Sequence, residues 1–298
     1  MRTLVIAAAV LLSFTVRAQT PNFDAVQIKT LKVAQNIYML EGMGGNIALS
    51  VGEDGVLMVD DQFAPLSAKI LDAIKAITDK PVRFLVNTHY HWDHTGGNEN
   101  IGKLGALIVA HDNVYKRMAS NQVVTLLKQS LPPYPKVALP VITFSDRVTY
   151  HINGDDIVVL HVPPSHTDGD SFVRFQDANV VHTGDVFASG RYPFIDVENH
   201  GSVMGIVKAM DMLIPTLDEF TKVIPGHGPV STRKEVIAYR HMIYTIGTRV
   251  QKLVKQGKTL EQVIAAKPAA EFDAEWGKFR KTDDFIPFVY YGFAPMKK

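Results

Sequence analysis

The sequence predicts an α/β protein, or α+β in a looser classification, built as a four-layer αβ/βα sandwich with a C-terminal helical extension. Three observations support this fold class. Short apolar segments with the period of strands precede segments with the period of helices. That order occurs twice along the chain, which indicates two sheets face to face with helices outside. From residue 233 onward the periodicity is mainly helical.

The first half is predicted to open with a strand meander over residues 24–62. Residues 26–31 alternate between apolar and polar, and residues 55–60 form the apolar run of a buried strand that follows a turn. The helical spacing of apolar residues over 65–78 ends just before Pro81. Strands are expected at residues 26–31, 37–40, 47–51, 55–60, 82–87 and 106–110, and helices at 65–78 and 112–119.

The second half is predicted to be richer in strands. A polar, proline-rich stretch at residues 130–140 precedes it and is expected to form a surface loop or flap. Strands are expected at residues 142–144, 147–152, 157–161, 171–175, 180–182 and 223–224, with one helix at 204–213. The main domain is therefore predicted to span residues 24–232.

The C-terminal extension, residues 233–298, is predicted to begin with two helices. A long amphipathic helix is expected at 233–256 and a shorter one at 259–267. Thr259 fits an N-cap, and Gln262 three residues later completes a capping box. Two hypotheses for the extension are packing over the main domain and dimerisation, and the oligomeric state is left open.

Composition excludes several classes of protein and of site. Apolar residues make up 46% of the 298 positions and charged residues 20%, which is typical of a globular protein with a sizeable core. The formal net charge of +1 comes from 31 basic and 30 acidic residues, so no nucleic-acid partner is expected. The chain contains no cysteine, which excludes disulfides, thiolate nucleophiles and every zinc site with a sulfur ligand.

Residues 1–18 have the pattern of an export signal. Arg2 supplies a positive start, residues 4–14 form an apolar run, and small or moderate residues precede a cleavage site after Ala18. The run is short for a membrane span. We therefore expect a secreted or periplasmic protein with no stable membrane association once the signal is cleaved.

The chemistry is predicted from the run His89-Tyr90-His91-Trp92-Asp93-His94, which follows a strand directly. Side chains two positions apart on extended chain project to the same side, so two of the histidines can converge on one metal ion. Imidazole and carboxylate are ligands of zinc and similar cations. Three of the 11 histidines fall within these six residues, which indicates a metal site at a strand end.

Three later motifs place further ligand types at strand ends. His166 stands in Ser-His-Thr-Asp-Gly-Asp, Asp185 ends the run His-Thr-Gly-Asp, and His227 stands in Pro-Gly-His-Gly. Together with the first run, this set resembles the metallo-β-lactamase superfamily, whose signature is H-x-H-x-D-H followed by a distant histidine, an aspartate or cysteine, and a last histidine. The resemblance extends from about residue 30 to residue 230.

The resemblance implies two metal-binding groups joined by a bridging carboxylate. It assigns His89, His91 and His166 to the first metal, Asp93, His94 and His227 to the second, and Asp185 to the bridge. Two zinc ions are the expected cofactors, with iron or manganese as alternatives. The implied enzyme is an exported dinuclear zinc hydrolase acting on a small molecule, with a metal-bound hydroxide attacking an amide or ester-type carbonyl. Asp93 would be the catalytic residue that orients this nucleophile and passes its proton on.

The metal site leaves the substrate open. Asp185 replaces the cysteine of the commonest β-lactamase subclass, and Ala188 replaces the lysine that subclass usually carries three residues later. These differences favour a glyoxalase II-like thioester, lactone or phosphoester hydrolase as an alternative. A non-hydrolytic member, either iron-dependent or an accessory metal-binding protein, is the other alternative.

Other polar residues receive weaker assignments. Arg191 and Tyr192 follow the predicted bridge closely and are predicted to contact the substrate. His111 is expected to be structural or to support a metal ligand rather than to bind metal itself, and His200 is left unassigned. Tyr90 and Trp92 are expected to point away from the metals and to pack.

Overall fold

The computed structural model describes residues 21–127 and 129–296. The export signal predicted for residues 1–18 lies outside this range. The element order alternates strands and helices twice before a helical C-terminal part, as the sequence predicts. The α/β sandwich fold is thereby confirmed.

The first sheet has seven strands in the order β1-β2-β3-β4-β5-β6-β9. The first four strands pair antiparallel as a meander, whereas β4, β5, β6 and β9 run parallel to one another. Its strands are β1 (Lys29–Lys32), β2 (Ile37–Glu41), β3 (Ile47–Gly52), β4 (Gly55–Val59), β5 (Val82–Asn87), β6 (Leu107–His111) and β9 (Ile142–Phe144). Every residue of β4 is buried, which explains its unbroken apolar run.

The second sheet has five strands in the order β10-β11-β12-β13-β14. They are β10 (Arg147–Ile152), β11 (Asp155–His161), β12 (Ser171–Phe175), β13 (Val180–His182) and β14 (Lys222–Ile224). The first four pair antiparallel, and β13 and β14 are parallel. The carboxyl ends of β13 and β14 therefore meet at one edge of the sheet.

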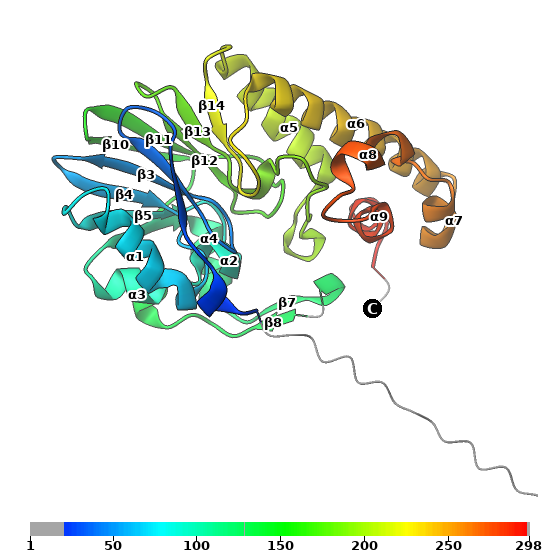
Figure 1. Cartoon of the computed structure of the whole chain (residues 1–298). Helices are drawn as coiled ribbons and strands as arrows, with labels where there is room; N and C mark the ends of the chain where they lie inside the picture. Colours follow the sequence, from blue (N-terminus) through cyan, green and yellow to red (C-terminus); the bar gives the residue numbers. More distant parts are fainter. Residues whose placement is uncertain (1–20, 128, 297–298) are drawn as a thin grey trace, which may run out of the picture.

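Helices cover the outer face of each sheet (Figure 1). One face is covered by α1 (Ser67–Lys75) and α3 (Asn98–Lys103), and the other by α5 (Val203–Leu213) and α6 (Arg233–Lys255). Apolar side chains of both sheets form the core between them, among them Val59 and Val86 from the first sheet and Val173 and Phe175 from the second. This is the four-layer arrangement that the sequence predicts.

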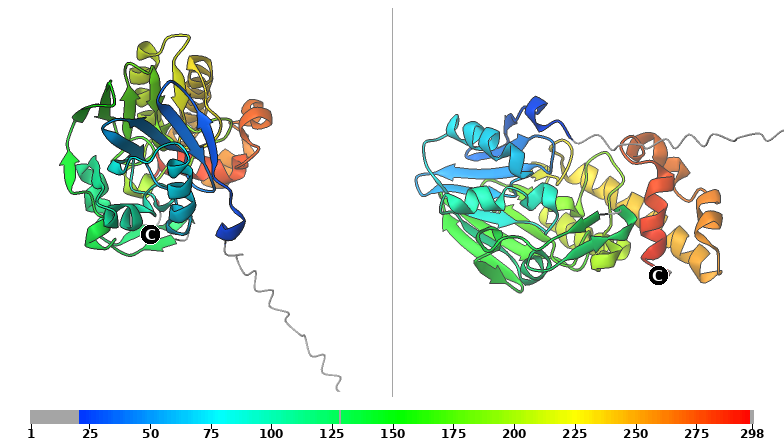
Figure 2. Two further views of the ribbon diagram at one scale, coloured as in Figure 1. Left: turned by 60° about the vertical axis from the view of Figure 1, so that its left-hand side comes forward. Right: turned by 90° about the horizontal axis from the view of Figure 1, so that it is seen from below.

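The remaining helices lie beside the sandwich or extend it. They are α2 (Trp92–Thr95), α4 (Asp112–Met118), α7 (Leu260–Ala265), α8 (Asp273–Trp276) and α9 (Thr282–Tyr291). Thr259 caps α7, and Gln262 completes the predicted capping box. The helices from α7 onward, drawn from orange to red, gather at one end of the sandwich (Figure 2). No helix in the described ranges is both long and apolar enough to cross a membrane.

One segment differs from the sequence-based expectation, and in another the structure adds helix bounds to the predicted helical extension beyond residue 267. The stretch at 130–140, expected to be a loop, begins inside a hairpin of β7 (Gln122–Val124) and β8 (Gln129–Leu131). Its prolines follow the hairpin, so they mark where pairing ends rather than excluding it. The tail beyond residue 267 contains α8 and α9, although Pro287 lies inside α9. Aromatic residues such as Phe285 are fully buried there, so tertiary packing stabilises a helix that propensity disfavours.

Candidate metal centre

Strand topology brings the predicted site residues to one edge of the sandwich. The histidine run follows β5, and Asp60 follows the neighbouring parallel strand β4. Asp185 and His227 follow the parallel strands β13 and β14 of the other sheet. Carboxyl ends of parallel strands meet at the same edge, where α/β folds bind their ligands. His166 joins them from the connection between β11 and β12.

The first predicted donor group is three buried histidines. One ring nitrogen from each of His89, His91 and His166 lies within 4.8 Å of the others. The Nδ1 of His91 is 2.8 Å from the Nε2 of His166. All three side chains are less than a tenth exposed, so their nitrogens face a space shielded from solvent. Three imidazoles converging in this way suit one divalent cation of the zinc type.

The second predicted donor group is Asp93, His94 and His227. These residues also offer ligand atoms that lie within 4.8 Å of one another. The Nε2 of His227 is 3.2 Å from the Oδ2 of Asp93, and the Nε2 of His94 is 3.8 Å from the same oxygen. The group mixes nitrogen with carboxylate oxygen, which again matches zinc, iron or manganese rather than calcium.

Asp185 lies between the two groups. Its Oδ2 is 3.7 Å from the Nε2 of His166 in the first group and 3.4 Å from the Nε2 of His227 in the second. Its Oδ1 is 3.1 Å from the Nε2 of His94. One carboxylate therefore contacts members of both groups, as a bridging ligand requires. The structure brings all seven residues predicted as metal ligands together.

Several buried atoms of the cluster lack hydrogen-bond partners among the described residues. They are the Nε2 of His89, together with the Nε2 of His94 and the Oδ1 of Asp185, whose 3.1 Å contact is an ion pair without hydrogen-bond geometry. A buried polar atom without a partner costs about 1–3 kcal/mol, so native proteins rarely leave three in one place. A metal ion in each donor group would satisfy them. The residues present therefore fit a two-metal site.

Hydrogen bonds from behind orient the histidines of the first group. The Nδ1 of His89 contacts the hydroxyl of Thr88 at 3.0 Å, and the Nε2 of His91 lies 3.0 Å from Asp196 Oδ2. The Nδ1 of His166 donates to the backbone carbonyl of Phe194 at 2.9 Å. Such partners fix which nitrogen faces the metal and raise its basicity.

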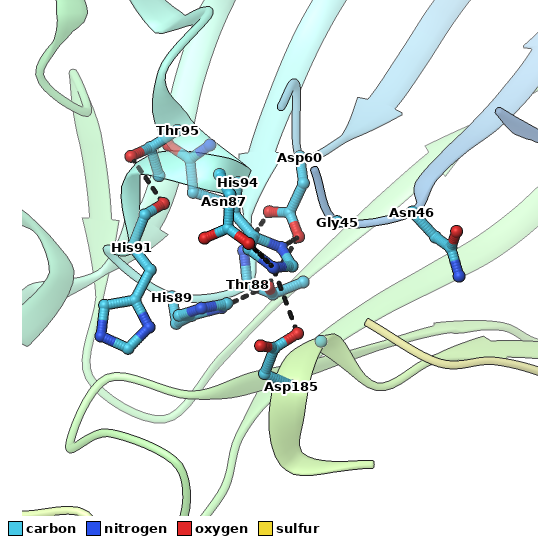
Figure 3. A network of polar contacts seen from close by, with 12 residues as sticks. Gly45, Asn46, Asp60, Asn87, Thr88, His89, His91, His94, Thr95 and Asp185 are labelled. Atoms are coloured by element: carbon cyan, nitrogen blue, oxygen red, sulfur yellow. Dashed lines mark hydrogen bonds and ion pairs between the residues drawn. The ribbon is translucent and has the colours of Figure 1, made fainter. Parts of the chain in front are cut away.

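Asp60 holds the second group in a similar way (Figure 3). Its Oδ2 lies 2.7 Å from the Nδ1 of His94 and also accepts a 2.7 Å hydrogen bond from the Thr88 hydroxyl. Asp60 adopts a left-handed backbone with φ of 60°, which is strained for a residue other than glycine. Asp60 also lies near His89 and His94 as a potential ligand. Its oxygens are already engaged with hydrogen-bond donors, so we assign it a supporting role.

Burial and neighbouring charge move the histidine pKa values in opposite directions in the two groups. Burial, together with the other histidines, lowers the pKa of His89 and lowers that of His166 to about 4. Burial also opposes charge on His94 and His227, but the carboxylates outweigh it. Asp185 and Asp93 raise the pKa of His94, and they raise that of His227 to about 9.

The two carboxyl groups of the cluster are held ionised. Burial would raise their pKa values, but the nearby histidines oppose and exceed that effect. His94 and His227 lower the pKa of Asp93 to about 2, and His227 and His94 hold that of Asp185 well below its usual range. Both groups can therefore act as anionic ligands at neutral pH.

Two glycines leave the space that these side chains occupy. A Cβ atom added at Gly45 would collide with the ring of His94, and one added at Gly226 would collide with the Oδ1 of Asp185. The close approach of backbone to donor at both positions requires a residue without a side chain. His94 is thus positioned by sterics as well as by its hydrogen bond to Asp60, and Asp185 by sterics as well as by its ion pairs.

A cavity of about 470 Å³ opens over the cluster. Its lining includes the donors His91, Asp93, Asp185 and His227. The hairpin β7–β8 contributes apolar side chains on one side, and the C-terminal extension contributes Phe279 on another. The metal donors therefore lie in a pocket large enough for a small molecule.

The residues given weaker assignments have distinct positions. Arg191 and Tyr192 both line the cavity, but the Tyr192 hydroxyl donates to Asp273 Oδ1 at 2.8 Å and is directed to the C-terminal extension. Tyr90 is buried, as expected, and its hydroxyl donates to Asp196. Trp92 is 39% exposed and lines the cavity rim.

His111 and His200 do not belong to either group of metal donors. The Nε2 of His111 donates to the Ser145 carbonyl at 3.2 Å, and its ring stacks on His161 at 3.6 Å. His111 also caps α4 through its Nδ1. His200 is exposed in a left-handed turn, outside the cavity lining that the described residues form.

Besides Thr88 and Asp60, sequence reasoning missed four further residues that act at this site. Asp196 and Phe194 support donors, Asn199 donates to Asp196 at 2.9 Å, and Arg280 lines the cavity. None belongs to a recognisable motif, and Asp196 lies 105 positions from the histidine it contacts. The only available signal is the concentration of polar and aromatic residues in the loop that follows Asp185.

Comparison with known proteins identifies the family of the chain. A family model described as the metallo-beta-lactamase superfamily matches residues 37–232. A hydroxyacylglutathione hydrolase of Pelagibacter ubique is 27% identical over 158 residues, covering 52% of this chain and 56% of that protein. A probable hydroxyacylglutathione hydrolase, glo2, of Schizosaccharomyces pombe is 26% identical over 64% of this chain and 67% of its own length. The chain thus spans about half to two thirds of these curated relatives.

Solved structures share the fold at low identity. A metallo-beta-lactamase from Pontibacter korlensis has a TM-score of 0.60 at 17% identity, covering 73% of this chain and 99% of that one. The sec-alkylsulfatase Pisa1 from Pseudomonas sp. has a TM-score of 0.68 at 17% identity, covering 92% of this chain and 51% of that one. The likeness to Pisa1 is the more extensive of the two, since it covers a larger share of this chain.

Proposed function

The chain belongs to the metallo-beta-lactamase superfamily, and on that premise we propose that it is a hydrolase that holds two zinc ions and breaks the ester-type bond at the carbonyl carbon of a small molecule. The position of Asp185 is the observation on which this rests. One anionic side chain contacts both donor groups, at 3.7 Å from His166 and 3.4 Å from His227. Two cations held close together repel each other, and a carboxylate between them reduces that repulsion.

The donor set also supports zinc as the metal. His89, His91 and His166 would hold one ion, and Asp93, His94 and His227 the other. When bound, such ions polarise a carbonyl oxygen and lower the pKa of water from about 15.7 toward 7. Nitrogen and carboxylate donors also suit iron or manganese, so metal identity is part of the proposal.

Asp93 is the proposed acid–base residue. Its Oδ2 faces His227 and His94, and the same residue lines the cavity where substrate must lie. Because its pKa is lowered to about 2, the carboxylate is ionised at neutral pH and can accept a hydrogen bond from the attacking water. It can then deliver the proton to the leaving group.

The choice of carbonyl follows from the relatives and from the ligand set. Two curated relatives are named for hydrolysis of hydroxyacylglutathione, an acylated thiol, and this favours an ester-type substrate. Hydrolysis of a β-lactam amide is the second candidate. It is supported by the fold shared with metallo-beta-lactamases and weakened by Ala188, which offers no cation where a β-lactam carboxylate would bind.

One set of assays separates these functions. The metal-replete protein is analysed for metal content and tested with 4-nitrophenyl acetate, an acyl thioester and nitrocefin. We expect two zinc ions per chain and turnover of the first two compounds. His89→Ala should lose metal and activity together, whereas His151→Ala, at an exposed histidine, should retain both.

Each alternative has a distinct outcome in these assays. Turnover of nitrocefin alone would replace the ester proposal with β-lactam hydrolysis. A single iron ion with no hydrolysis would indicate a non-hydrolytic member. Activity that survives His89→Ala at reduced metal content would overturn the metal mechanism itself.

We also propose that the protein acts outside the cytoplasm. The support is the charged start, apolar run and cleavage pattern of residues 1–18. N-terminal sequencing of the protein from a cell envelope or culture medium fraction should begin just after Ala18. A chain that keeps residues 1–18 and stays in the cytoplasmic fraction would overturn this proposal.

A further inference from the structure

Two arginine side chains line the cavity together with the metal donors. Arg191 lies in the loop after the short helix η5 (Gly184–Val186), and Arg280 lies in the turn between α8 and α9. Among the described residues that line the cavity, these are the only arginine or lysine side chains. One comes from the main domain and the other from the C-terminal extension, so the cavity is completed by both.

Neither arginine has an acidic partner. Among the described residues, no hydrogen bond or ion pair involves either guanidinium group, and the Nε of Arg280 is buried without a partner. Arg117, by contrast, binds both oxygens of Asp168, at 3.2 and 2.6 Å. A half-buried guanidinium group with unmatched donors is costly unless a ligand supplies the acceptor.

Aromatic rings hold both guanidinium groups in place. The Cζ of Arg191 lies 4.2 Å from the ring centre of Phe279, and the Cζ of Arg280 lies 5.1 Å from that of Phe288 and 6.0 Å from that of Phe194. Stacking on a ring face fixes the plane of a guanidinium group and leaves its edge N–H donors free. The arginines are therefore oriented before any ligand binds.

Phe194 connects this pair to the metal donors. Its ring centre lies 5.6 Å from those of His91 and His166, and its carbonyl accepts the hydrogen bond from His166. Arg280 is thus separated from the first donor group by one aromatic ring. A small molecule in the cavity can contact the arginines and the metal site at the same time.

Electrostatics favour an anion between the two arginines, since Asp185 attracts Arg191 but forms no ion pair with it among the described residues. Burial lowers the pKa of Arg280; Asp284 opposes that effect, and the positive charge of Arg191 adds to it. Asp284 makes no ion pair with Arg280 in the described structure, so it does not neutralise the pair. A bound anion would relieve the repulsion between the two cations.

We propose that Arg191 and Arg280 form an oxyanion-binding subsite that selects small acyl substrates carrying a negative charge away from the scissile bond. The guanidinium fork matches the two oxygens of a carboxylate and also fits a sulfate or phosphate group. The subsite rests on the proposed function in one respect, since the same cavity must hold the reacting carbonyl. It adds the substrate class, which the metal donors leave open.

A matched pair of esters tests the subsite. 4-Nitrophenyl butyrate is neutral, and mono-4-nitrophenyl glutarate carries a carboxylate on an acyl chain of similar length with the same leaving group. On the metal-replete enzyme, Arg280→Met and Arg191→Met should each raise KM for the anionic ester by roughly 10- to 100-fold, because a hydrogen bond to a charged group contributes about 1.5–3 kcal/mol. The increase should be at least ten times larger than for the neutral ester.

Two further variants serve as controls. Arg280→Lys keeps the charge but loses the paired N–H donors of the guanidinium group. Its KM for the anionic ester should therefore lie between those of the wild type and Arg280→Met. Arg240→Met removes a partly buried arginine of α6 that pairs with Asp211 and does not line the cavity, and it should leave the ratio of the two KM values unchanged. An unchanged ratio in both Arg191→Met and Arg280→Met would overturn the subsite.

Competition identifies the preferred oxyanion. Glutarate, sulfate and inorganic phosphate are each added during turnover of the anionic ester. The strongest competitor in the wild-type enzyme gives the oxyanion class, and its inhibition constant should rise at least tenfold in the Arg191→Met/Arg280→Met double variant. Equal inhibition constants in the two proteins for all three anions would contradict the proposal.

A binding measurement separates failure of this subsite from failure of the proposed function. If the metal-replete wild type hydrolyses neither ester, the proposed hydrolase activity fails, but binding can still be measured. Calorimetry with glutarate should then detect binding that the double variant weakens at least tenfold, while butyrate binding changes less. Glutarate binding that is absent, or equal in both proteins, would overturn the subsite on its own.

Discussion

The two ends of the cavity are stabilised in different ways. At the metal end, each of four donor histidines has one ring nitrogen within hydrogen-bond distance of a hydroxyl, a carboxylate or a backbone carbonyl. The partners are Thr88, Asp196, Asp60 and Phe194. At the arginine end, ring faces hold the cations, and the described structure offers no acidic partner.

This difference indicates that the two ends have different roles. Hydrogen bonds fix the direction of each donor nitrogen, as metal binding and catalysis require. Ring stacking fixes the plane of a guanidinium group but leaves its N–H donors available to a ligand. On the proposed function, the sandwich would supply the reactivity and the C-terminal extension would contribute to substrate selectivity.

Removing the shared carboxylate should have the largest effect on the metal end. Asp185→Asn keeps the shape of the side chain but removes the negative charge between the donor groups. We expect loss of one metal ion and a fall in kcat/KM of roughly 10²–10³-fold, since fixed charges at a reacting centre contribute on this scale. Metal analysis combined with ester kinetics measures both. Full occupancy and activity would show that Asp185 is not a bridging ligand.

Removing a supporting carboxylate should have a smaller effect. Asp196→Asn weakens the contact that orients His91, so metal affinity should fall about 10- to 100-fold. Competition with a chelator measures this affinity. Asp211→Asn, at a surface carboxylate paired with Arg240, is the matched control and should leave it unchanged. Equal affinity in the two variants would contradict the difference between the two ends of the cavity.

Acid titration distinguishes a structural histidine from the donors. Burial, aided by the neighbouring His161, lowers the pKa of His111 from 6.5 to about 4. Between these values the unfolded chain binds a proton that the folded chain does not, so falling pH destabilises the fold. At pH 5 this contributes about 2 kcal/mol of lost stability.

The variant His111→Asn isolates that contribution, because asparagine can still cap α4. Urea unfolding at pH 7 and pH 5 should show a smaller acid destabilisation in the variant, by about 1–2 kcal/mol. Both proteins keep every metal donor, so other titrations cancel in the comparison. The same loss in both would mean that His111 is protonated in the fold.

The smallest effect is expected where the C-terminal extension meets the cavity. Tyr192→Phe removes the hydrogen bond to Asp273 but keeps the ring that stacks on Phe285 at 4.7 Å. The free energy of unfolding should fall by about 1 kcal/mol, while metal content stays the same. Urea unfolding and metal analysis test this. A loss of metal instead would mean that the extension supports the donors.

Local sequence patterns predict the metal end well. His89, His91, Asp93 and His94 lie within six residues, so one strand end and one helical turn determine how they converge. Asp185 and His227 also follow strands closely, and those strands, β13 and β14, are parallel neighbours in one sheet. Short apolar runs predict buried strands as well, as residues 55–60 do for β4, because buried strands show an unbroken apolar pattern.

The arginine end depends on contacts that the sequence does not encode locally. Arg280 lies 86 positions after Phe194 in the sequence, in a turn between two short helices, and contacts its ring. One of those helices contains Pro287 and forms because its aromatic residues are buried against α6 and the sandwich. Neither the turn nor the helix has a periodic pattern long enough to predict.

The placement of Arg280 near the end of the chain has a consequence for how the protein is made. Synthesis from the N-terminus completes every metal donor, up to His227, before the segment that contains Arg280 leaves the ribosome. The metal donors are thus synthesised before Arg280, the arginine proposed to select the substrate. Mutations confined to the last turns of the chain could change which molecules are accepted without altering a metal ligand. The apolar side of α9 limits that freedom, because Phe285 and Val289 belong to the core.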